Sequence, residues 1–91
     1  MVDKVFIALQ NDEEARAIIE AIVEDNPDVI INEMPAMVKI DSPNRLVIKR
    51  ETVEDKIGRD FDLQELQVHL ISLSGNIEET DDEFVLAWGT S

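Results

Sequence analysis

The most regular hydrophobic pattern in the chain lies between residues 11 and 26, and it predicts an amphipathic helix. Four apolar residues there recur at the i, i+3, i+4 and i+7 spacing of one helical face: Ala15, Ile18, Ile19 and Ile22. Asn11 followed by Glu14 has the spacing of an N-cap and its N3 partner, so the helix is expected to begin there. Pro27 ends the helix, because a proline disfavours helical angles in the residue before it.

Runs of apolar and β-branched residues predict strands along the rest of the chain. These runs cover residues 2–9, 29–34, 36–40, 45–50, 68–74 and 84–88. Pro35 separates the second run from the third as a bend. Residues 41–44 (Asp-Ser-Pro-Asn) are typical of a turn, and they make the third and fourth runs the arms of a predicted hairpin. Gly75-Asn76 is the expected turn after the fifth run, and the acidic residues 78–83 are a solvated connection to the last.

A second helical region is predicted between the fourth and fifth strands. Thr52 with Asp55 resembles a capping box, and Gly58 is the residue type expected just after a helix end. A further single turn is expected within residues 60–67, starting at either aspartate of that segment. The predicted order is therefore β-α-β-β-β-α-β-β. This order indicates a compact α+β fold with helices packed on antiparallel-rich sheets, and residues 1–91 are expected to form a single domain.

The charge of the chain limits the choice of partners. It carries 21 acidic and 8 basic residues, for a formal net charge of −13, and six of the eight bases lie within residues 39–59. Nucleic acids and anionic membranes are bound through clustered lysine and arginine, so neither is expected as a partner. The acidity favours either simple solubility or steering toward a basic protein surface. With no cysteine and no apolar run approaching the roughly 20 residues that span a bilayer, we expect a soluble cytoplasmic protein.

No group of residues has the pattern of a catalytic or metal site. Glu65 and His69 lie four positions apart, but His69 is the only histidine and a carboxylate-bridged metal site needs a second one. The acidic run 78–83 lacks the alternating ligands, the glycine and the terminal glutamate of an EF-hand loop. The serines have no base other than His69, and the scattered glycines form no phosphate loop. We expect no cofactor, no metal and no catalysis by the isolated protein.

What remains is surface for protein recognition. In an extended strand over residues 68–74, the two faces would be Val68, Leu70 and Ser72, and His69, Ile71 and Leu73. One face is expected to pack on the helices. An uncovered second face would form an exposed apolar patch, which commonly marks a partner site. Alternation alone does not decide which face lies outward. The bend between the second and third strands adds further candidates, although a methionine at strand spacing is more often in the core: Met34, Pro35 and Met37.

Four stretches of the chain resemble a known protein family. They are ARAIIEAIVEDNP (15–27), PAMVKI (35–40), LVIKRETVEDKIGRDFDLQELQV (46–68) and ISLSGNIEETDDEFVLAW (71–88). In this order, and over nearly the whole chain, they are similar to the regulatory (effector, or coupling) proteins of bacterial multicomponent diiron monooxygenases. The similarity is greatest to the regulatory components of phenol hydroxylases.

The resemblance implies a non-catalytic, cofactor-free α+β protein that docks on a separate diiron aromatic hydroxylase. Such a protein would regulate oxygen activation, substrate access and coupling to the electron supply. In the family, the strand before the glycine faces the hydroxylase, and carried over to this chain it supplies His69, Ile71, Ser72 and Leu73, with Gly75 at its end. Supporting contacts are expected from Asn76, from the 34–37 bend (Met34, Pro35, Met37) and from the basic segment 45–59, which begins at Arg45.

Two other functions stay open from the residues alone. One is a small-molecule-binding regulatory domain of ferredoxin-like type, although such domains usually bind at paired Gly-rich loops, which this sequence lacks. The other is an enzyme that uses Glu65 and His69, which would require measurable activity in the isolated protein.

Overall fold

The computed structural model describes residues 4–43 and 45–88. Its strands are β1 (Val5–Gln10), β2 (Ile30–Glu33), β3 (Met37–Ser42), β4 (Arg45–Lys49), β5 (Leu70–Ser74), β6 (Asn76–Glu79) and β7 (Glu83–Ala87). Its helices are α1 (Glu13–Asp25), α2 (Arg50–Ile57) and α3 (Leu66–His69), with a 3₁₀ turn η1 (Leu63–Glu65) directly before α3. The expected α+β class and order of elements are confirmed. The short strand β6 is an addition that the hydrophobic pattern does not predict.

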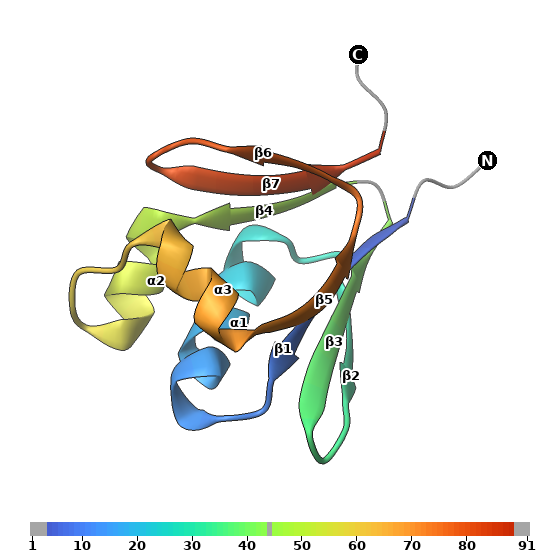
Figure 1. Cartoon of the computed structure of the whole chain (residues 1–91), viewed down its shortest axis with the longest axis horizontal. Coiled ribbons are helices and arrows are strands. Elements are labelled where there is room, and N and C mark those ends of the chain that lie inside the picture. Colours follow the sequence, from blue (N-terminus) through green and yellow to red (C-terminus); the bar gives the residue numbers. More distant parts are fainter. Residues whose placement is uncertain (1–3, 44, 89–91) are drawn as a thin grey trace.

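The strands form two antiparallel sheets. The first sheet has the order β2-β3-β1-β5, and the second has the order β4-β7-β6. Figure 1 shows the two sheets set at an angle to each other, with the helices on the inner side of that angle. The chain passes from the first sheet to the second twice, once between β3 and β4 and once between β5 and β6.

The core lies where the helices meet the inner faces of both sheets. Its fully or almost fully buried apolar residues on α1 and on strands β1, β3, β4 and β7 are Val5, Ile7, Leu9, Ala15, Ile18, Ala21, Ile22, Val38, Ile40, Leu46, Ile48, Phe84 and Leu86. Phe61, Leu63 and Leu66 add to this core from the segment around η1 and α3. Burying a side chain of this size contributes roughly 1.5–3 kcal/mol. The predicted apolar face of α1 is therefore the face that joins the two sheets.

The ends of the helices correct two predicted caps. Asp12, not Asn11, caps α1, because its Oδ1 accepts a 2.8 Å hydrogen bond from the backbone N–H of Ala15. Asn11 instead donates from Nδ2 to the carbonyl of Met34 at 3.2 Å. The predicted end of α2 at Gly58 is confirmed, and this glycine has the left-handed φ of 83°.

The predicted capping box of Thr52 and Asp55 is wrong, because α2 already begins at Arg50, directly after β4. The preceding residue, Lys49, provides no side-chain cap. The N–H of Arg50 donates instead to the carbonyl of Asp82 at 2.8 Å, in the turn between β6 and β7. A tertiary contact thus replaces the local cap.

The predicted hairpin of the third and fourth strands is also wrong. β4 pairs with β7 in the second sheet, with Leu46 opposite Leu86 and Ile48 opposite Phe84. These four side chains are buried together. Their burial stabilises the pairing of β4 with β7 more than the short turn stabilises a hairpin of β3 and β4. Within the predicted turn, Asn44 lies outside the described residues, and the Ser42 hydroxyl donates to the Arg45 carbonyl at 2.6 Å.

A single asparagine joins the end of α1 to the outer edge of the second sheet. Asn26 follows Asp25, and Pro27 comes next, so the predicted end of α1 is confirmed. The Asn26 side chain donates to the Val47 carbonyl at 2.7 Å and accepts from the Val47 N–H at 2.9 Å. It therefore pairs with β4 in the way that a neighbouring strand would.

The segment after α2 is more helical than the sequence predicts. Asp62 forms a capping box with Glu65, which confirms a start within residues 60–67, but the helix continues through His69. Leu63, Leu66 and His69 recur every three residues, and all three are buried. The strand predicted over 68–74 is therefore shorter, and β5 starts only at Leu70.

The acidic run 78–83 is not one solvated connection. Glu78 and Glu79 belong to β6, and Glu83 belongs to β7. Only Thr80, Asp81 and Asp82 form the turn. In it the Thr80 hydroxyl accepts from the N–H groups of Asp82 and Glu83 at 3.2 and 3.1 Å. Gly75 correspondingly does not end a hairpin but carries the chain from the first sheet to the second.

Candidate protein-interaction surface

The residues predicted for an interface fall at three places in the structure. His69 and the β5 residues Ile71, Ser72 and Leu73 lie at the outer strand of the first sheet. Met34, Pro35 and Met37 lie at the tip of the β2–β3 hairpin. Arg45, Gly75 and Asn76 lie at the other end of the molecule, where Arg45 and Asn76 both pair opposite Ala87.

The hairpin tip and the start of β5 share one end of the first sheet. Met37 pairs with Gln10 at the end of β1, and the adjacent Leu9 pairs with Leu70. Met34 and Pro35 are exposed, and Met37 is half-buried. These two groups of predicted contacts are therefore close enough to reach one partner together.

His69, which the family resemblance implies as a docking residue, does not point outward. Only 8% of the residue is exposed, because it ends a helix and its ring turns toward α1. The face of His69, Ile71 and Leu73, whose exposure the alternation left open, is therefore not a common exposed face. The period of the segment is helical up to residue 69 and extended only afterwards.

Within β5 the alternation is broken by a β-bulge. Ser72 pairs with Ala8 and Leu70 with Leu9, so Ile71 between them has no partner opposite it on β1. Leu73 pairs with Ile7 and, like Leu70, packs against the core. Ile71 is the exposed apolar residue of the strand, with 47% of its surface accessible.

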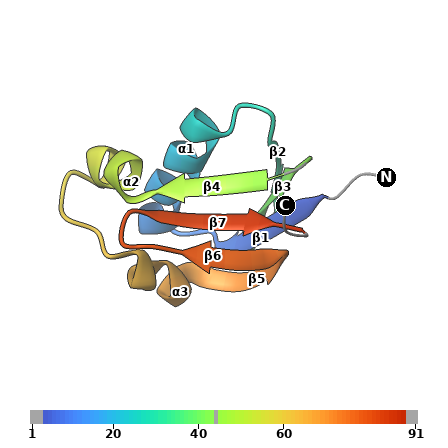
Figure 2. The ribbon, with the colours of Figure 1, turned by 90° about the horizontal axis from the view of Figure 1, so that it is seen from above.

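Two further exposed apolar residues lie on the elements directly before and after β5, and they are not among the sequence-predicted candidates. Val68 on α3 is 70% exposed, and Ile77 on β6 is 51% exposed. Figure 2 shows α3, β5 and β6 along the same side of the molecule, where β5 ends the first sheet and β6 ends the second. We call Val68, Ile71 and Ile77 the edge surface. The helical spacing of the buried residues within 63–69 could have indicated that Val68 lies on the outer face of a helix. No pattern in the sequence indicates β6.

The basic segment 45–59 is largely paired within the chain. Lys56 Nζ lies 2.9 Å from a carboxylate oxygen of Glu24, and Arg50 Nη2 lies 3.0 Å from one of Asp82. Arg59 contacts two carboxylates, as described below. The cluster of bases therefore neutralises neighbouring acids, and Arg45, which is exposed at the start of β4, stays the candidate contact within it.

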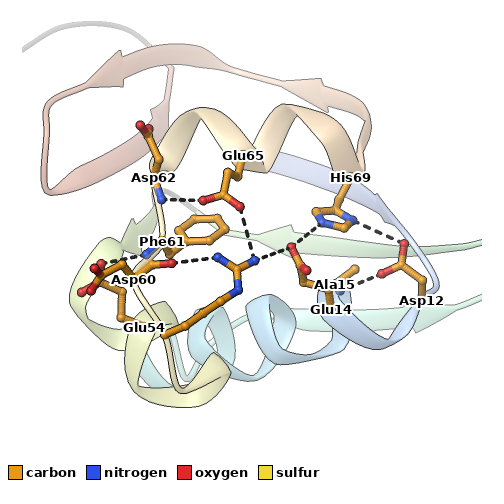
Figure 3. A network of polar contacts seen from close by, with 10 residues as sticks. Asp12, Glu14, Ala15, Glu54, Asp60, Phe61, Asp62, Glu65 and His69 are labelled. Carbon is orange, nitrogen blue, oxygen red and sulfur yellow. Dashed lines mark hydrogen bonds and ion pairs between the residues drawn. The ribbon is translucent and has the colours of Figure 1, made fainter.

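A polar network fixes the segment before β5 to the start of α1 (Figure 3). The His69 ring lies between two carboxylates, with Nδ1 3.3 Å from Asp12 Oδ2 and Nε2 3.1 Å from Glu14 Oε1. Asp12 thus caps α1 with one oxygen and contacts His69 with the other.

The network continues through Arg59 to η1. Arg59 Nη2 lies 3.2 Å from Glu14 Oε1 and 3.3 Å from Glu65 Oε1. The second oxygen of Glu65 accepts from the Asp62 N–H at 3.0 Å, which completes the capping box. Glu65 and His69, the pair considered for catalysis, are thus both engaged in contacts within the fold.

Two carboxyl groups of this network have pKa values below their usual range. The hydrogen bond from the Ala15 N–H lowers the pKa of Asp12, and the charge of His69 adds to the effect. For Glu65, the hydrogen bond from the Asp62 N–H is the main cause of the lowered pKa, followed by its hydrogen bond with Arg59. Both groups therefore favour the folded state when they are ionised.

We expect the stability of the protein to fall in acid because of these groups. A carboxyl whose pKa is lower in the folded state stabilises the fold above its unfolded value and loses this effect as the pH falls through the folded value. The reference values are 3.8 for Asp12 and 4.5 for Glu65, so the loss should begin near pH 4.5 and continue below it. Urea unfolding at a series of pH values measures this loss of stability.

Asp12→Asn keeps an N-cap acceptor but cannot titrate. It should reduce the slope of the free energy of unfolding against pH between pH 5 and 2. The same change at exposed Asp28 should leave the slope unaltered, and equal slopes in all three proteins would refute the assignment.

Two hollows on the surface of residues 4–43 and 45–88 lack the form of an enclosed apolar ligand site. A hollow of about 920 Å³ between α2, η1 and the β6–β7 turn is lined mainly by carboxylates, among them Glu54, Asp62 and Asp82. A hollow of about 180 Å³ between α1 and β2 is lined by Ile19, Ile31 and Val38 with polar neighbours, and it is smaller than the 300–1,000 Å³ usual for small-molecule sites. This geometry does not favour the small-molecule-binding alternative.

Within residues 4–43 and 45–88, no group of three or more histidine, aspartate or glutamate side chains is placed to hold a metal ion. None of the helices in the described part of the chain is long and apolar enough to cross a membrane.

Comparison with known proteins places the fold and the sequence in one family. Residues 3–87 match the model of the MmoB/DmpM family. The chain is 48% identical, over 84 residues, to the stimulatory component DmpM of phenol 2-monooxygenase from Pseudomonas sp. strain CF600, covering 92% of this chain and 93% of that protein. It is 30% identical over 71 residues to the effector subunit of the alkene monooxygenase system from Xanthobacter autotrophicus strain Py2, covering 76% of this chain and 70% of that one.

Solved structures give the same result. A chain of the phenol hydroxylase–regulatory protein complex is 48% identical, superposes with a TM-score of 0.90, and is matched over 94% of this chain and 99% of its own length. Regulatory protein B of soluble methane monooxygenase shares the fold at 19% identity, with a TM-score of 0.76 over 96% of this chain and 66% of its own. The resemblance to monooxygenase regulatory proteins is thereby confirmed, and the chain belongs to the MmoB/DmpM family.

Proposed function

We propose that this protein is a non-catalytic effector that docks on a diiron phenol hydroxylase, or a related aromatic hydroxylase. Docked there, it would regulate oxygen activation, substrate access and coupling. The observation that carries the proposal is the 48% identity, over almost the whole length of both chains, with a regulatory protein in complex with phenol hydroxylase. In this proposal residues 1–91 act as one domain, and the protein works in the cytoplasm, where the hydroxylase and its electron supply would meet it.

The proposed docking surface is the edge surface together with the hairpin tip. Val68, Ile71 and Ile77 are exposed apolar side chains on the last helix and on the end strands of both sheets. Exposed apolar side chains that lie together commonly mark a site of protein interaction. This contact would be extended by Ser72, which is also exposed. Met34 and Pro35, at the same end of the first sheet, would extend it further.

The remaining predicted residues take supporting roles in the proposal. Leu73 packs against the core and His69 contacts α1, so both would hold β5 in place from behind. Gly75, Asn76 and Arg45 lie where the sheets meet, and they would set the position of β6 relative to β5.

Docking can change the hydroxylase only through a difference in affinity. A protein that binds two conformations equally well shifts nothing, however tightly it binds. The effector would therefore bind one conformation of the hydroxylase more tightly and raise its population. The formal charge of −13 would speed the encounter with a basic surface of the hydroxylase and make the rate depend on salt.

The test is a titration of this protein into a purified diiron phenol hydroxylase with its reductase. We expect product formation, or product formed per electron consumed, to rise and to saturate near one effector per active site. The isolated protein should turn over no phenol, because Glu65 and His69 are held in contacts within the fold. A flat response with hydroxylases acting on phenol and its methylated derivatives would refute the proposal. Turnover by the isolated protein would do the same.

A further inference from the structure

The most unusual side chain in the structure is His69, because each of its ring nitrogens faces a carboxylate. Asp12 Oδ2 lies 3.3 Å from Nδ1 and Glu14 Oε1 lies 3.1 Å from Nε2. Only a tenth of the His69 side chain is exposed, whereas the two acids are about two-fifths exposed. The ring is thus a buried connector between two partly hydrated carboxylates.

This geometry suits one protonation state of the ring. A neutral imidazole has a single N–H, so one of its nitrogens would present a lone pair to a carboxylate oxygen, which can only accept. An imidazolium has two N–H groups and donates to both acids at once, in charge-assisted hydrogen bonds that are about twice as strong as neutral ones.

Every charged group that faces the ring belongs to the polar network described above. Asp12 and Glu14 come from the start of α1, Glu65 from η1, and Arg59 from the loop between α2 and η1. Glu14 Oε1 is shared between Arg59 and His69. The cluster holds three carboxylates and one guanidinium, so a positive charge on His69 brings it closer to neutrality.

The position of His69 in the chain links this cluster to the docking surface. His69 is the last residue of α3, and Leu70 begins β5. Val68 precedes it, and Ile71, at the bulge, follows two residues later. The two hydrogen bonds of the ring therefore fix the point at which the chain leaves the helix and enters the exposed strand.

We propose that His69, as an imidazolium held between Asp12 and Glu14, is a positioning residue for the docking surface. Loss of either hydrogen bond of the ring releases the start of β5 from α1 and weakens stimulation of the hydroxylase. This inference rests on the proposed function for its effect on stimulation. The charge of the ring and its coupling to β5 belong to the protein alone.

The first test is nitrogen-15 NMR of the isolated protein, in which His69 is the only histidine. At neutral pH both ring nitrogens should give imidazolium shifts, and both should show coupling to the ring protons typical of a protonated nitrogen. In Glu14→Gln, which replaces one of the two carboxylates that contact the ring, the backbone amides of Leu70, Ile71 and Ser72 should shift. Neutral-ring signals at pH 7, or β5 amides that do not respond to Glu14→Gln, would overturn the proposal.

The second test compares variants in the hydroxylase titration. His69→Gln can donate from one amide group but carries no charge, and the concentration needed for half-maximal stimulation should rise about tenfold, as expected for one lost charge-assisted hydrogen bond. Glu14→Gln should raise that concentration as well. Glu13→Gln, the same change at an exposed neighbour on the same helical turn, should not.

The outcomes separate this inference from the proposed function. A wild-type protein that stimulates no hydroxylase would refute the function, while the NMR shifts would still decide the role of His69. His69→Gln and Glu14→Gln proteins that both stimulate like the wild type would refute the positioning role and leave the function intact.

Discussion

Ile71→Asp should abolish most of the stimulation of a phenol hydroxylase while the protein stays folded. Ile71 lies at the bulge of β5, where it has no partner opposite it on β1, and almost half of its surface is accessible. The substitution should therefore cost little folding stability, on the order of 0.5 kcal/mol, as for other surface positions. In a docked complex the same aspartate would place an unpaired charge in an apolar contact. A loss of about 2–4 kcal/mol of binding energy follows, which is roughly a 30- to 1,000-fold weaker affinity.

Ile30→Asp is the matched control for this prediction. Ile30 is an exposed isoleucine on β2, the strand at the opposite edge of the same sheet. It receives the same change in charge and size, so it reports any general effect of added negative charge. We expect near-normal half-saturation for Ile30→Asp, and circular dichroism and thermal unfolding should find both variants folded. If Ile71→Asp stimulated like the wild type, or if both variants lost stimulation equally, the edge surface would not be the docking surface.

The parts of the fold that local sequence determines were predictable. The apolar period of α1 and the proline after it define a helix whose buried face is the predicted one. Gly58 ends α2, and the Asp62–Glu65 box starts the next helical turn, because these contacts involve residues only a few positions apart. The errors lie where the decisive partner is distant in the chain. β4 pairs with β7, which lies about 40 residues later, and not with β3, which precedes it directly in the chain. The alternation of apolar residues in β4 is compatible with either pairing.

The same distinction explains the candidate site. The sequence singled out the segment 68–74 as the candidate docking region, but the exposed and buried faces of that segment could not be assigned from alternation. The ring of His69 is turned inward by Asp12, which lies 57 positions earlier in the sequence. Ile71 is turned outward by a bulge, and the register of β5 against β1 produces that bulge. The residues near 68–74 in the sequence reveal neither the contact with Asp12 nor the register against β1. The helical spacing of Leu63, Leu66 and His69 was present in the sequence, and it argued against a strand that begins at residue 68.

The edge surface depends on two strands that belong to different sheets, so the residue that joins them should be sensitive. Gly75 has a φ of 138°, which L side chains rarely adopt, and a Cβ at this position would lie 3.0 Å from Cγ1 of Val5. Val5 is completely buried in β1 and cannot move aside freely. We therefore expect Gly75→Ala to lower the free energy of unfolding by about 2–4 kcal/mol, from backbone strain and overpacking together.

Gly58→Ala separates these two contributions. Gly58 also has a positive φ, of 83°, but nothing lies within 4 Å of a Cβ built there, so only the backbone term of about 1 kcal/mol applies. Urea unfolding of both variants should give the larger loss for Gly75→Ala. Adding Val5→Ala should recover the overpacking part in a double-mutant cycle. Equal losses at the two glycines would show that the approach of Val5 is unimportant. A larger loss for Gly75→Ala would mean that the close approach of Gly75 to Val5 constrains the position of β6 relative to β5. Gly75→Ala should then also weaken stimulation of the hydroxylase at temperatures where the variant is fully folded.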